Sequence, residues 1–203
     1  MNNKWYSESC DQNREPILAI LKNVLRNNNR LLEIGSGSGQ HAVYFPKFLP
    51  HIQWQPSDRM ENITSIEAWR EEAELTNVSP AIVLDVDQKE WPELSIDAIF
   101  SANAVHIMSW SSVKNLMHGV GNLFDNNDSS ECRLCLYGPF NYGGNYSSDS
   151  NARFDQWLKD RDPVSGIRHF EDMCELASQN NMHLQDDFEM PANNRILVFK
   201  KQA

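Results

Sequence analysis

The sequence predicts an α/β fold, in which a mostly parallel sheet is covered by helices on both faces. Two observations lead to this prediction: five strand-like runs alternate with amphipathic helical patterns, and two further strand-like runs at the end follow one another directly. Parallel strands need crossovers, so the alternation indicates a parallel sheet, while the final pair indicates an antiparallel hairpin at its edge. The length of 203 residues suits one domain, residues 1–203.

The five alternating runs are the expected parallel strands, because each is short, carries apolar residues and ends at glycine or polar residues. They cover residues 31–34, 52–56, 81–84, 96–102 and 132–137. The expected hairpin pairs residues 184–190 with residues 195–200. Its connection contains Asn193 and Asn194, and asparagine tolerates the left-handed conformations of tight turns.

The intervening helices have local start or stop signals. Pro16 suits the first turn of the first helix. Pro46 should kink or shorten the helix after the first strand. Thr64 and Glu67 have the spacing of a capping box, and Ser111 precedes the apolar face of the helix after the fourth strand.

Two segments outside the alternating pattern are candidates for covering a binding site. Residues 138–166 change in composition to Gly, Asn, Ser, Asp and Tyr, with one short helix expected around residues 154–158. Connections of this length are more often functional than idle, so we expect an inserted loop on the substrate side. Residues 1–29 hold the first helix and a possible lid. The candidates for that lid are Tyr6, Asn13 and Arg14, although Arg14 fits a surface charge equally well.

The charge and hydropathy of the chain narrow its partners. A net charge of −10 with scattered Lys and Arg disfavours nucleic-acid binding, which depends on clustered positive charge, and suits a cationic ligand. No apolar run approaches the ~18 residues that span a bilayer, and residues 1–7 do not resemble a secretory signal. We therefore expect a cytoplasmic protein that acts on a small molecule, without nucleic-acid or membrane partners.

Cys132 and Cys135 have the spacing of half a zinc or redox motif. They fall in an expected strand, where residues three apart face opposite sides of the sheet, and two further ligands at recognisable spacing are missing. We expect both to be structural, with no metal site and no disulfide framework.

The glycine-rich run after the first strand is the sharpest chemical signal. Glu33 is followed by Gly35, Gly37 and Gly39, and glycine lets a backbone turn tightly and approach a ligand without a Cβ in the way. Backbone N–H groups at the start of the next helix favour polar or anionic ligand groups. The dinucleotide fingerprint needs glycine at position 40, which is Gln40, so a nicotinamide-dependent oxidoreductase is disfavoured. A structural turn without a ligand is the alternative at this point.

Acidic residues fall at or just before the ends of three expected strands. They are Glu33, Asp58 and Asp85. In open α/β sheets, ligands bind at the carboxyl ends of the strands, near the point where strand order reverses. Asp58 lies about twenty residues beyond the glycines, where a carboxylate accepts hydrogen bonds from ribose hydroxyls. Asp85 with Val86 can cover an adenine ring. A solvated loop end is the alternative for each carboxylate, but it explains all three together less well.

Over nearly its whole length, the sequence resembles the class I S-adenosylmethionine-dependent methyltransferases. It is still more similar to the family of methyltransferase-like protein 26, the bacterial DUF938 domain. The segments that carry this closer similarity are 13–18, 39–45, 54–58 and 190–194. The resemblance implies a Rossmann-like three-layer α/β/α sandwich with a seven-stranded, mostly parallel sheet and an antiparallel C-terminal hairpin strand. It also implies S-adenosylmethionine as the cofactor, but it supplies no methyl acceptor.

The same resemblance assigns residues to the cofactor site. The matched positions are Glu33, Gly35, Ser36, Gly37, Gly39, Asp58, Asp85, Val86 and Asn103. By the resemblance, Asp58 binds the ribose, and Asp85 with Val86 forms the adenine wall. Asn103 faces the methionine part of the cofactor and its sulfonium.

The catalytic residues stay open, with three candidates. They are His106, Tyr137 and Asn141. His106 follows Asn103 closely and suits proton transfer near neutral pH, although a structural histidine explains it at least as well. The aromatic residues of 137–142 either line an acceptor pocket or pack beneath the long loop.

The expected function is transfer of a methyl group from S-adenosylmethionine to an unidentified small-molecule acceptor, as in methyltransferases of the EC 2.1.1 type. The reaction is an in-line displacement in which the enzyme chiefly aligns the nucleophile. The alternative is a catalytically silent S-adenosylmethionine-binding module with a regulatory or partner-binding role. Both alternatives need the same glycine loop and carboxylates, so only activity separates them.

Overall fold

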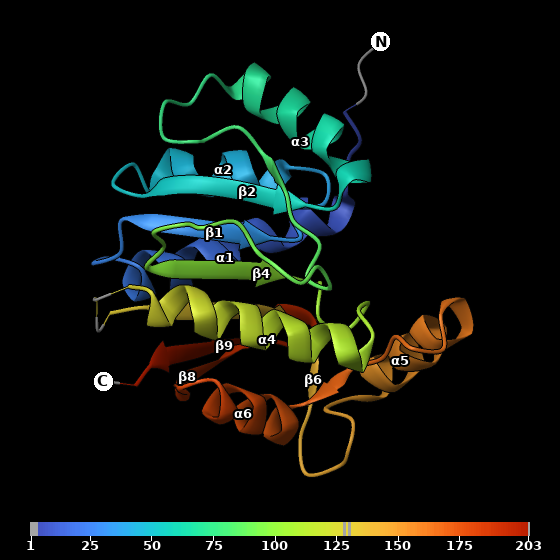
Figure 1. Ribbon diagram of the computed structural model, residues 1–203. Helices are drawn as coiled ribbons and strands as arrows, with labels where there is room; N and C mark the ends of the chain where they lie inside the picture. Colours follow the sequence, from blue (N-terminus) through green and yellow to red (C-terminus); the bar gives the residue numbers. More distant parts are fainter. Residues whose placement is uncertain (1–3, 128, 130, 203) are drawn as a thin grey trace.

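The computed structural model describes residues 4–127, 129 and 131–202. Within them, one seven-stranded sheet has the order β3-β2-β1-β4-β5-β9-β8 (Figure 1). Strands β1 to β5 pair in parallel, whereas β9 is antiparallel to both β5 and β8. The mostly parallel sheet with an antiparallel C-terminal hairpin is therefore confirmed.

The strands coincide with the apolar runs of the sequence. Their bounds are β1 (Arg30–Ile34), β2 (Gln53–Asp58), β3 (Ile82–Val83), β4 (Ala98–Ala102), β5 (Arg133–Gly138), β8 (Met182–Met190) and β9 (Asn194–Lys201). The interior strand β1 is buried from Leu31 to Ile34, because parallel neighbours flank it and helices cover both of its faces.

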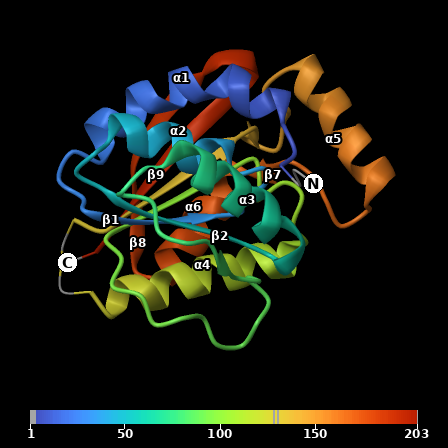
Figure 2. The same ribbon diagram turned by 90° about the horizontal axis from the view of Figure 1, so that it is seen from above.

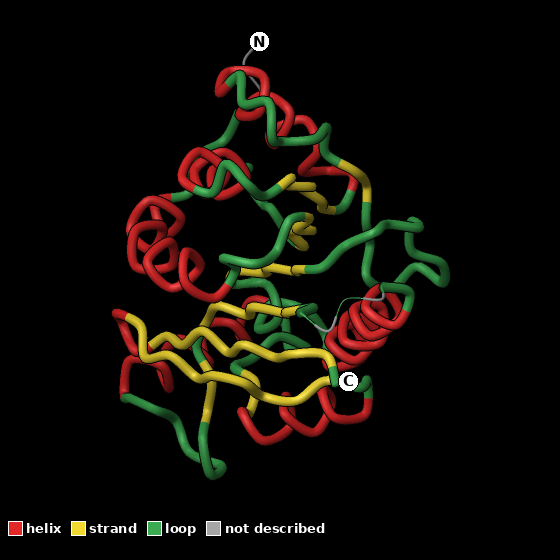
Figure 3. The backbone as a smooth tube through the Cα atoms, turned by 90° about the vertical axis from the view of Figure 1, so that its left-hand side faces the viewer, coloured by secondary structure: helices red, strands yellow, loops and turns green. Residues whose placement is uncertain are grey.

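Helices cover the sheet on both faces (Figures 2 and 3). One face carries α1 (Glu8–Val24) and α2 (Gln40–Phe48), and α3 (Met60–Ala73) packs against α2 and β2. The other face carries α4 (Trp110–Asp125) and α6 (Phe170–Gln179). Two clusters of buried apolar side chains, one on each side of the sheet, form the core. This is the expected three-layer sandwich.

The expected start of the first helix is wrong. α1 begins at Glu8, so Pro16 lies inside the helix rather than in its first turn. The missing N–H of a proline costs one helical hydrogen bond. Burial of Ile17, Leu18 and Leu21 on the face that meets the sheet offsets this cost. Pro46 also lies inside its helix, because α2 runs from Gln40 to Phe48 and ends two residues after the proline.

The expected capping box at Thr64 and Glu67 is also wrong. α3 begins at Met60, which places Thr64 within the helix. The Glu67 carboxylate instead accepts the Ala81 N–H (2.5 Å), which ties the helix to the approach to β3. In α4, the hydroxyl of Ser109 accepts the N–H of Ser112 (3.0 Å), so the cap lies slightly before the expected start.

The segment 138–166 holds more structure than its composition indicates. β6 (Phe140–Asn141) pairs in parallel with β7 (Arg168–His169), and α5 (Asp149–Arg161) runs for thirteen residues. The longer helix is hard to see in the sequence, because two of its three buried residues, Asn151 and Asp155, are polar. In Figure 1, α5 (orange) lies beyond the carboxyl ends of the strands.

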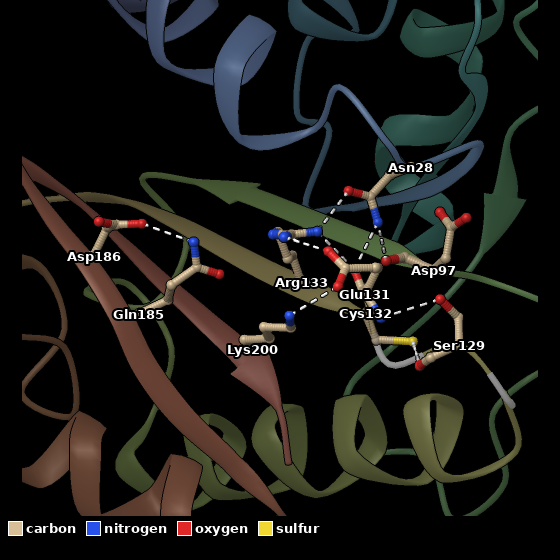
Figure 4. Close-up of polar contacts among 9 residues, drawn as sticks. All are labelled: Asn28, Asp97, Ser129, Glu131, Cys132, Arg133, Gln185, Asp186 and Lys200. Carbon is tan, nitrogen blue, oxygen red and sulfur yellow. Dashed lines mark hydrogen bonds and ion pairs between the residues drawn. The ribbon is translucent and has the colours of Figure 1, made fainter. Parts of the chain in front are cut away.

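A polar network joins the strands at the opposite end of the sheet (Figure 4). The buried Asn28 amide donates to the carbonyls of Asp97 (2.7 Å) and Glu131 (2.9 Å). The thiol of Cys132 donates to the Ser129 carbonyl (3.3 Å) in the same region. Cys132 belongs to one core cluster and Cys135 to the other, which confirms that the two thiols face opposite sides of the sheet.

Neither a metal site nor a membrane-spanning helix is found in the part of the chain that the structure describes. No group of three or more His, Cys, Asp or Glu side chains there is arranged to hold a metal ion. Among the same residues, none of the helices combines the length and apolar character needed to cross a bilayer.

Candidate functional site

A cleft of about 1080 Å³ opens at the carboxyl ends of the parallel strands. Residues at four strand ends line it: Ile34 of β1, Asp58 of β2, Ala102 of β4 and Tyr137 of β5. Strand order reverses between β1 and β4, which is where open α/β sheets bind ligands.

The N-terminal segment and α5 also line the cleft. The N-terminal residues are Trp5, Ser7, Ser9, Cys10, Gln12, Asn13 and Pro16. The Trp5 N–H donates to the Ser65 hydroxyl (3.0 Å) and the Ser7 N–H to the Gln40 side chain (2.6 Å), so this segment is fixed to α3 and α2. Two of the candidate lid residues, Tyr6 and Arg14, are not part of the lining.

The three glycines of the loop have left-handed backbones and different surroundings. The φ angles are 75° at Gly35, 57° at Gly37 and 98° at Gly39. A Cβ on Gly37 would find its nearest neighbour, a Trp5 ring atom, at 3.8 Å, so this glycine opens onto the cleft. A Cβ on Gly39 would lie 2.7 Å from the Ile66 Cα, and Gly39 does not line the cleft. Gly39 therefore permits close packing of α2 on α3, while Gly35 and Gly37 line the cleft.

Glu33 lies behind the loop rather than in the cleft. Its side chain is 2% exposed, and its carboxyl accepts the indole N–H of Trp54 (2.8 Å). Burial raises the pKa of Glu33 to about 7. Ser36 does line the cleft, and its hydroxyl accepts the Ser57 N–H (3.2 Å), which joins the loop to β2.

Asp58 joins the glycine loop to the start of α3. One carboxylate oxygen accepts the Gly37 N–H (2.7 Å), and the other accepts the Arg59 N–H (2.7 Å) and the Asn62 amide (3.0 Å). A carboxylate has about four acceptor positions, so these three donors leave room for one more. Asp58 lines the cleft and can receive a hydroxyl donor there.

Two further predicted positions lie at the end of β3. Asp85 and Val86 both line the cleft. The Asp85 carboxylate accepts the Asp87 N–H (3.0 Å), and Asp87 accepts the hydroxyl of Ser112 (2.7 Å) on α4. This chain of contacts fixes the wall that Asp85 and Val86 present to the cleft.

Asn103 follows β4 in a left-handed conformation, with φ at 54°. Its N–H donates to the Tyr137 carbonyl (2.8 Å), so the backbone at this point is tied to β5. Asparagine tolerates this conformation better than most residues, and strained backbone of this kind gathers at functional sites. Asn103 lines the cleft together with the glycine loop and His106.

His106 lines the cleft but is only 4% exposed. Its Nδ1 atom has no hydrogen-bond partner among the described residues. Burial, helped by the Arg168 guanidinium, lowers the pKa of His106 to about 4, so the ring is neutral at pH 7. The Phe154 ring of α5 meets the His106 ring at a steep angle, with centroids 5.3 Å apart.

The other two catalytic candidates differ in their placement. Tyr137 lines the cleft, and burial raises the pKa of its phenol. Asn141 is buried in β6 and does not line the cleft, so the structure does not bring it to the other candidates. Asn13, from the N-terminal segment, does line the cleft and accepts a hydrogen bond from the His41 ring (2.8 Å).

Several lining residues are not indicated by the sequence patterns. They include Trp5, Cys10, Phe154, Trp157, Arg161 and the turn residues 191–194. The sequence offers one signal that could have pointed to Phe154 and Trp157 as lining residues: their helical spacing within a segment that is expected to be functional. Nothing in a local pattern tells which distant strand end such a helix will face.

The fold is that of S-adenosylmethionine-dependent methyltransferases. The methyltransferase SibL matches with a TM-score of 0.78 at 16% identity, over 96% of this chain and 56% of that protein. Human N-acetylserotonin methyltransferase, solved with S-adenosylmethionine, matches with a TM-score of 0.78 at 13% identity, over 97% of this chain and 53% of that protein. N,N-8-amino-8-demethyl-D-riboflavin dimethyltransferase (RosA) from Streptomyces davawensis matches with a TM-score of 0.77 at 15% identity, over 96% of this chain and 55% of that protein. The chain thus spans just over half the length of these proteins.

Within that fold class, the chain belongs to the DUF938 family, whose description is "Protein of unknown function". The family model matches residues 4–201. The resemblance to this family in the sequence is therefore confirmed.

Proposed function

We propose that this protein binds S-adenosylmethionine and transfers its methyl group to a small-molecule acceptor. One observation carries the proposal: a single cleft at the strand-order reversal joins an open glycine loop, held by Asp58, to a buried neutral histidine. The first part is suited to an adenosine-bearing cation, and the second to an acceptor that must lose a proton.

The residues of the cleft fit this cofactor. Gly35 and Gly37 line the cleft without a side chain, and Asp58 keeps one acceptor position free. Asp85 and Val86 offer a carboxylate and an apolar surface beside them. A cleft of about 1080 Å³ is at the large end of ligand sites, which suits a nucleoside cofactor together with a second small molecule.

The chemistry divides between the cofactor and the chain. S-adenosylmethionine supplies a methyl group on a sulfonium sulfur, and the electron pair of the broken carbon–sulfur bond stays on sulfur. The chain aligns the acceptor, excludes water and removes a proton from the acceptor. His106 is our candidate for proton removal, because a neutral imidazole has a free nitrogen lone pair. Residues 1–29 and 138–166 would cover the acceptor, since both contribute to the lining.

Calorimetry with the Asp58→Ala variant tests the cofactor site. We expect its affinity for S-adenosylmethionine to fall about tenfold or more, which corresponds to roughly 1.4 kcal/mol. The Glu61→Ala variant is the control, because Glu61 is an exposed carboxylate on α3 outside the cleft. Undiminished affinity in Asp58→Ala, or binding of NAD in place of S-adenosylmethionine, would contradict the assigned site.

Activity is tested separately with cofactor labelled in its methyl group. Incubation with a small-metabolite extract should give at least one labelled product, and His106→Gln should slow its formation about a hundredfold or more. Tight cofactor binding without any labelled product would favour the binding module instead.

A further inference from the structure

A row of flat side chains runs along α5 and meets His106. The Trp157 ring stacks on the Phe154 ring, with centroids 5.7 Å apart and planes 18° apart. The Arg161 guanidinium lies over the Trp157 ring at 4.6 Å. Phe154, Trp157 and Arg161 are spaced by three and four residues, so they share one face of the helix, and all three line the cleft.

This wall of the cleft is apolar and accessible. Trp157 is 49% exposed, Ile107 56% and Val164 53%, and each lines the cleft. Phe154 is only partly buried, whereas the residues that anchor α5 to the rest of the molecule are Asn151, Asp155 and Leu158. The rings are therefore not needed to hold the helix in place, and an accessible apolar cluster inside a cleft marks a ligand surface.

The charges of this wall lie at one end of it. Its charged lining residues are Arg161 and Asp162, both at the C-terminal end of α5, while Phe154 next to His106 has no charged neighbour in the lining from α5. A ligand group that enters as far as His106 thus leaves water for aromatic and aliphatic surface. This environment disfavours a charged acceptor skeleton against the α5 wall and favours a flat apolar one.

We infer that the methyl acceptor is a planar aromatic molecule whose ring packs on Phe154 and Trp157 while a hydroxyl, thiol or amine on that ring reaches His106. This inference rests on the proposed function and adds the substrate class to it. In the transfer, the acceptor's heteroatom forms a bond to the methyl carbon as the carbon–sulfur bond breaks. The acceptor's proton passes to the neutral His106 ring, and the electron pair of the broken bond stays on sulfur.

A matched pair of probes tests the inference: 2-naphthol and its saturated counterpart decahydro-2-naphthol. Both carry one hydroxyl on a fused two-ring skeleton, but only 2-naphthol is flat and aromatic. Binding is measured by ligand-observed NMR titration in the presence of S-adenosylhomocysteine. We expect 2-naphthol to bind about threefold to tenfold more tightly than decahydro-2-naphthol, which is the range that ring stacking contributes. Equal affinities would overturn the inference.

Variants of Trp157 localise the effect. Trp157→Ala should remove most of the preference for 2-naphthol, and Trp157→Phe should restore part of it. Phe48→Ala is the matched control, because Phe48 is also an exposed aromatic (41%) but lies outside the cleft. An unchanged preference in Trp157→Ala would overturn the inference.

The affinity for S-adenosylhomocysteine, measured in the same samples, separates the two proposals. Retained cofactor affinity with no aromatic preference contradicts only the acceptor class. If the unsubstituted protein does not bind S-adenosylhomocysteine at all, that result contradicts the proposed function itself.

Discussion

Glu33 shows how a residue beside the glycine loop can stabilise the fold without lining the cleft. It precedes the loop, but its side chain points into the core, where it accepts the Trp54 indole N–H. The Ser57 hydroxyl also donates to its backbone carbonyl (2.7 Å). Glu33 therefore links β1 to β2 from behind the loop, and its ionisation state affects the stability of that junction.

The raised pKa of Glu33 predicts a pH dependence of stability. Its pKa is about 7 in the folded protein against a usual 4.5, so the folded state holds the proton more tightly than the unfolded state. Its contribution is favourable at low pH and is lost as pH rises from about 4.5 to about 7. Glu33→Gln removes this titration. Between pH 5 and pH 8, the free energy of unfolding of the unsubstituted protein should therefore fall by about 2 kcal/mol relative to that of the variant. Urea unfolding at both pH values checks this, and a pH-independent difference would contradict it.

At the scale of elements, the segment after α5 holds the loop that carries His106. The Gly166 N–H donates to the His106 carbonyl (2.8 Å), and the Ser165 hydroxyl donates to the Ile107 carbonyl (3.1 Å). The Arg168 guanidinium donates to the carbonyls of Val105 (3.0 Å) and Met108. The inserted segment thus positions the histidine through its backbone, as well as lining the cleft with α5.

Arg168 should act as a positioning residue for His106. In Arg168→Met, loss of the nearby positive charge should raise the pKa of His106 above its value of about 4, although burial keeps it below 6.5. Methyl transfer should fall about tenfold as the loop loosens. Arg168→Lys keeps the charge but loses the forked donor, so it should loosen the loop with a smaller change in pKa. NMR titration of the histidine ring protons measures the shift, and an unchanged His106 pKa in Arg168→Met would contradict this role.

Across the whole molecule, the cleft and a buried polar network lie at opposite ends of the sheet. The cleft lies at the carboxyl ends of the strands, and the Asn28 network lies at the other end (Figure 4). Asn28 joins the turn after α1 to the segments that enter β4 and β5, and its side-chain oxygen accepts from Arg133 (3.3 Å). Changes at this end should affect folding without changing the cofactor site.

Asn28→Ala tests this separation. The variant removes two buried hydrogen bonds, while Arg133 still donates to both carbonyls, so the free energy of unfolding should fall by about 2 kcal/mol. The affinity of the folded protein for S-adenosylmethionine should stay within about twofold. Asn23→Ala is the control, because the Asn23 side chain is exposed and bonds only within α1. A large loss of cofactor affinity at temperatures where Asn28→Ala is fully folded would show that the two ends are coupled.

The sheet and the position of the glycine loop could be predicted from local sequence patterns. Strand-like runs such as residues 31–34 and 132–137 became β1 and β5 because burial on both faces demands apolar residues, and this demand is visible locally. Likewise, Gly37 and Asp58 could be placed at strand ends from their spacing alone, and the structure shows them in contact.

Which residues share the cleft depends on contacts between elements that are distant in the sequence. Gly37 and Gly39 are indistinguishable in the sequence, yet Gly37 lines the cleft and Gly39 lies against the backbone of Ile66. Phe154 meets His106 across almost fifty residues, through an insertion with few buried apolar positions. Local periodicity reports which face of an element is buried, but contacts between distant elements depend on how the whole chain packs.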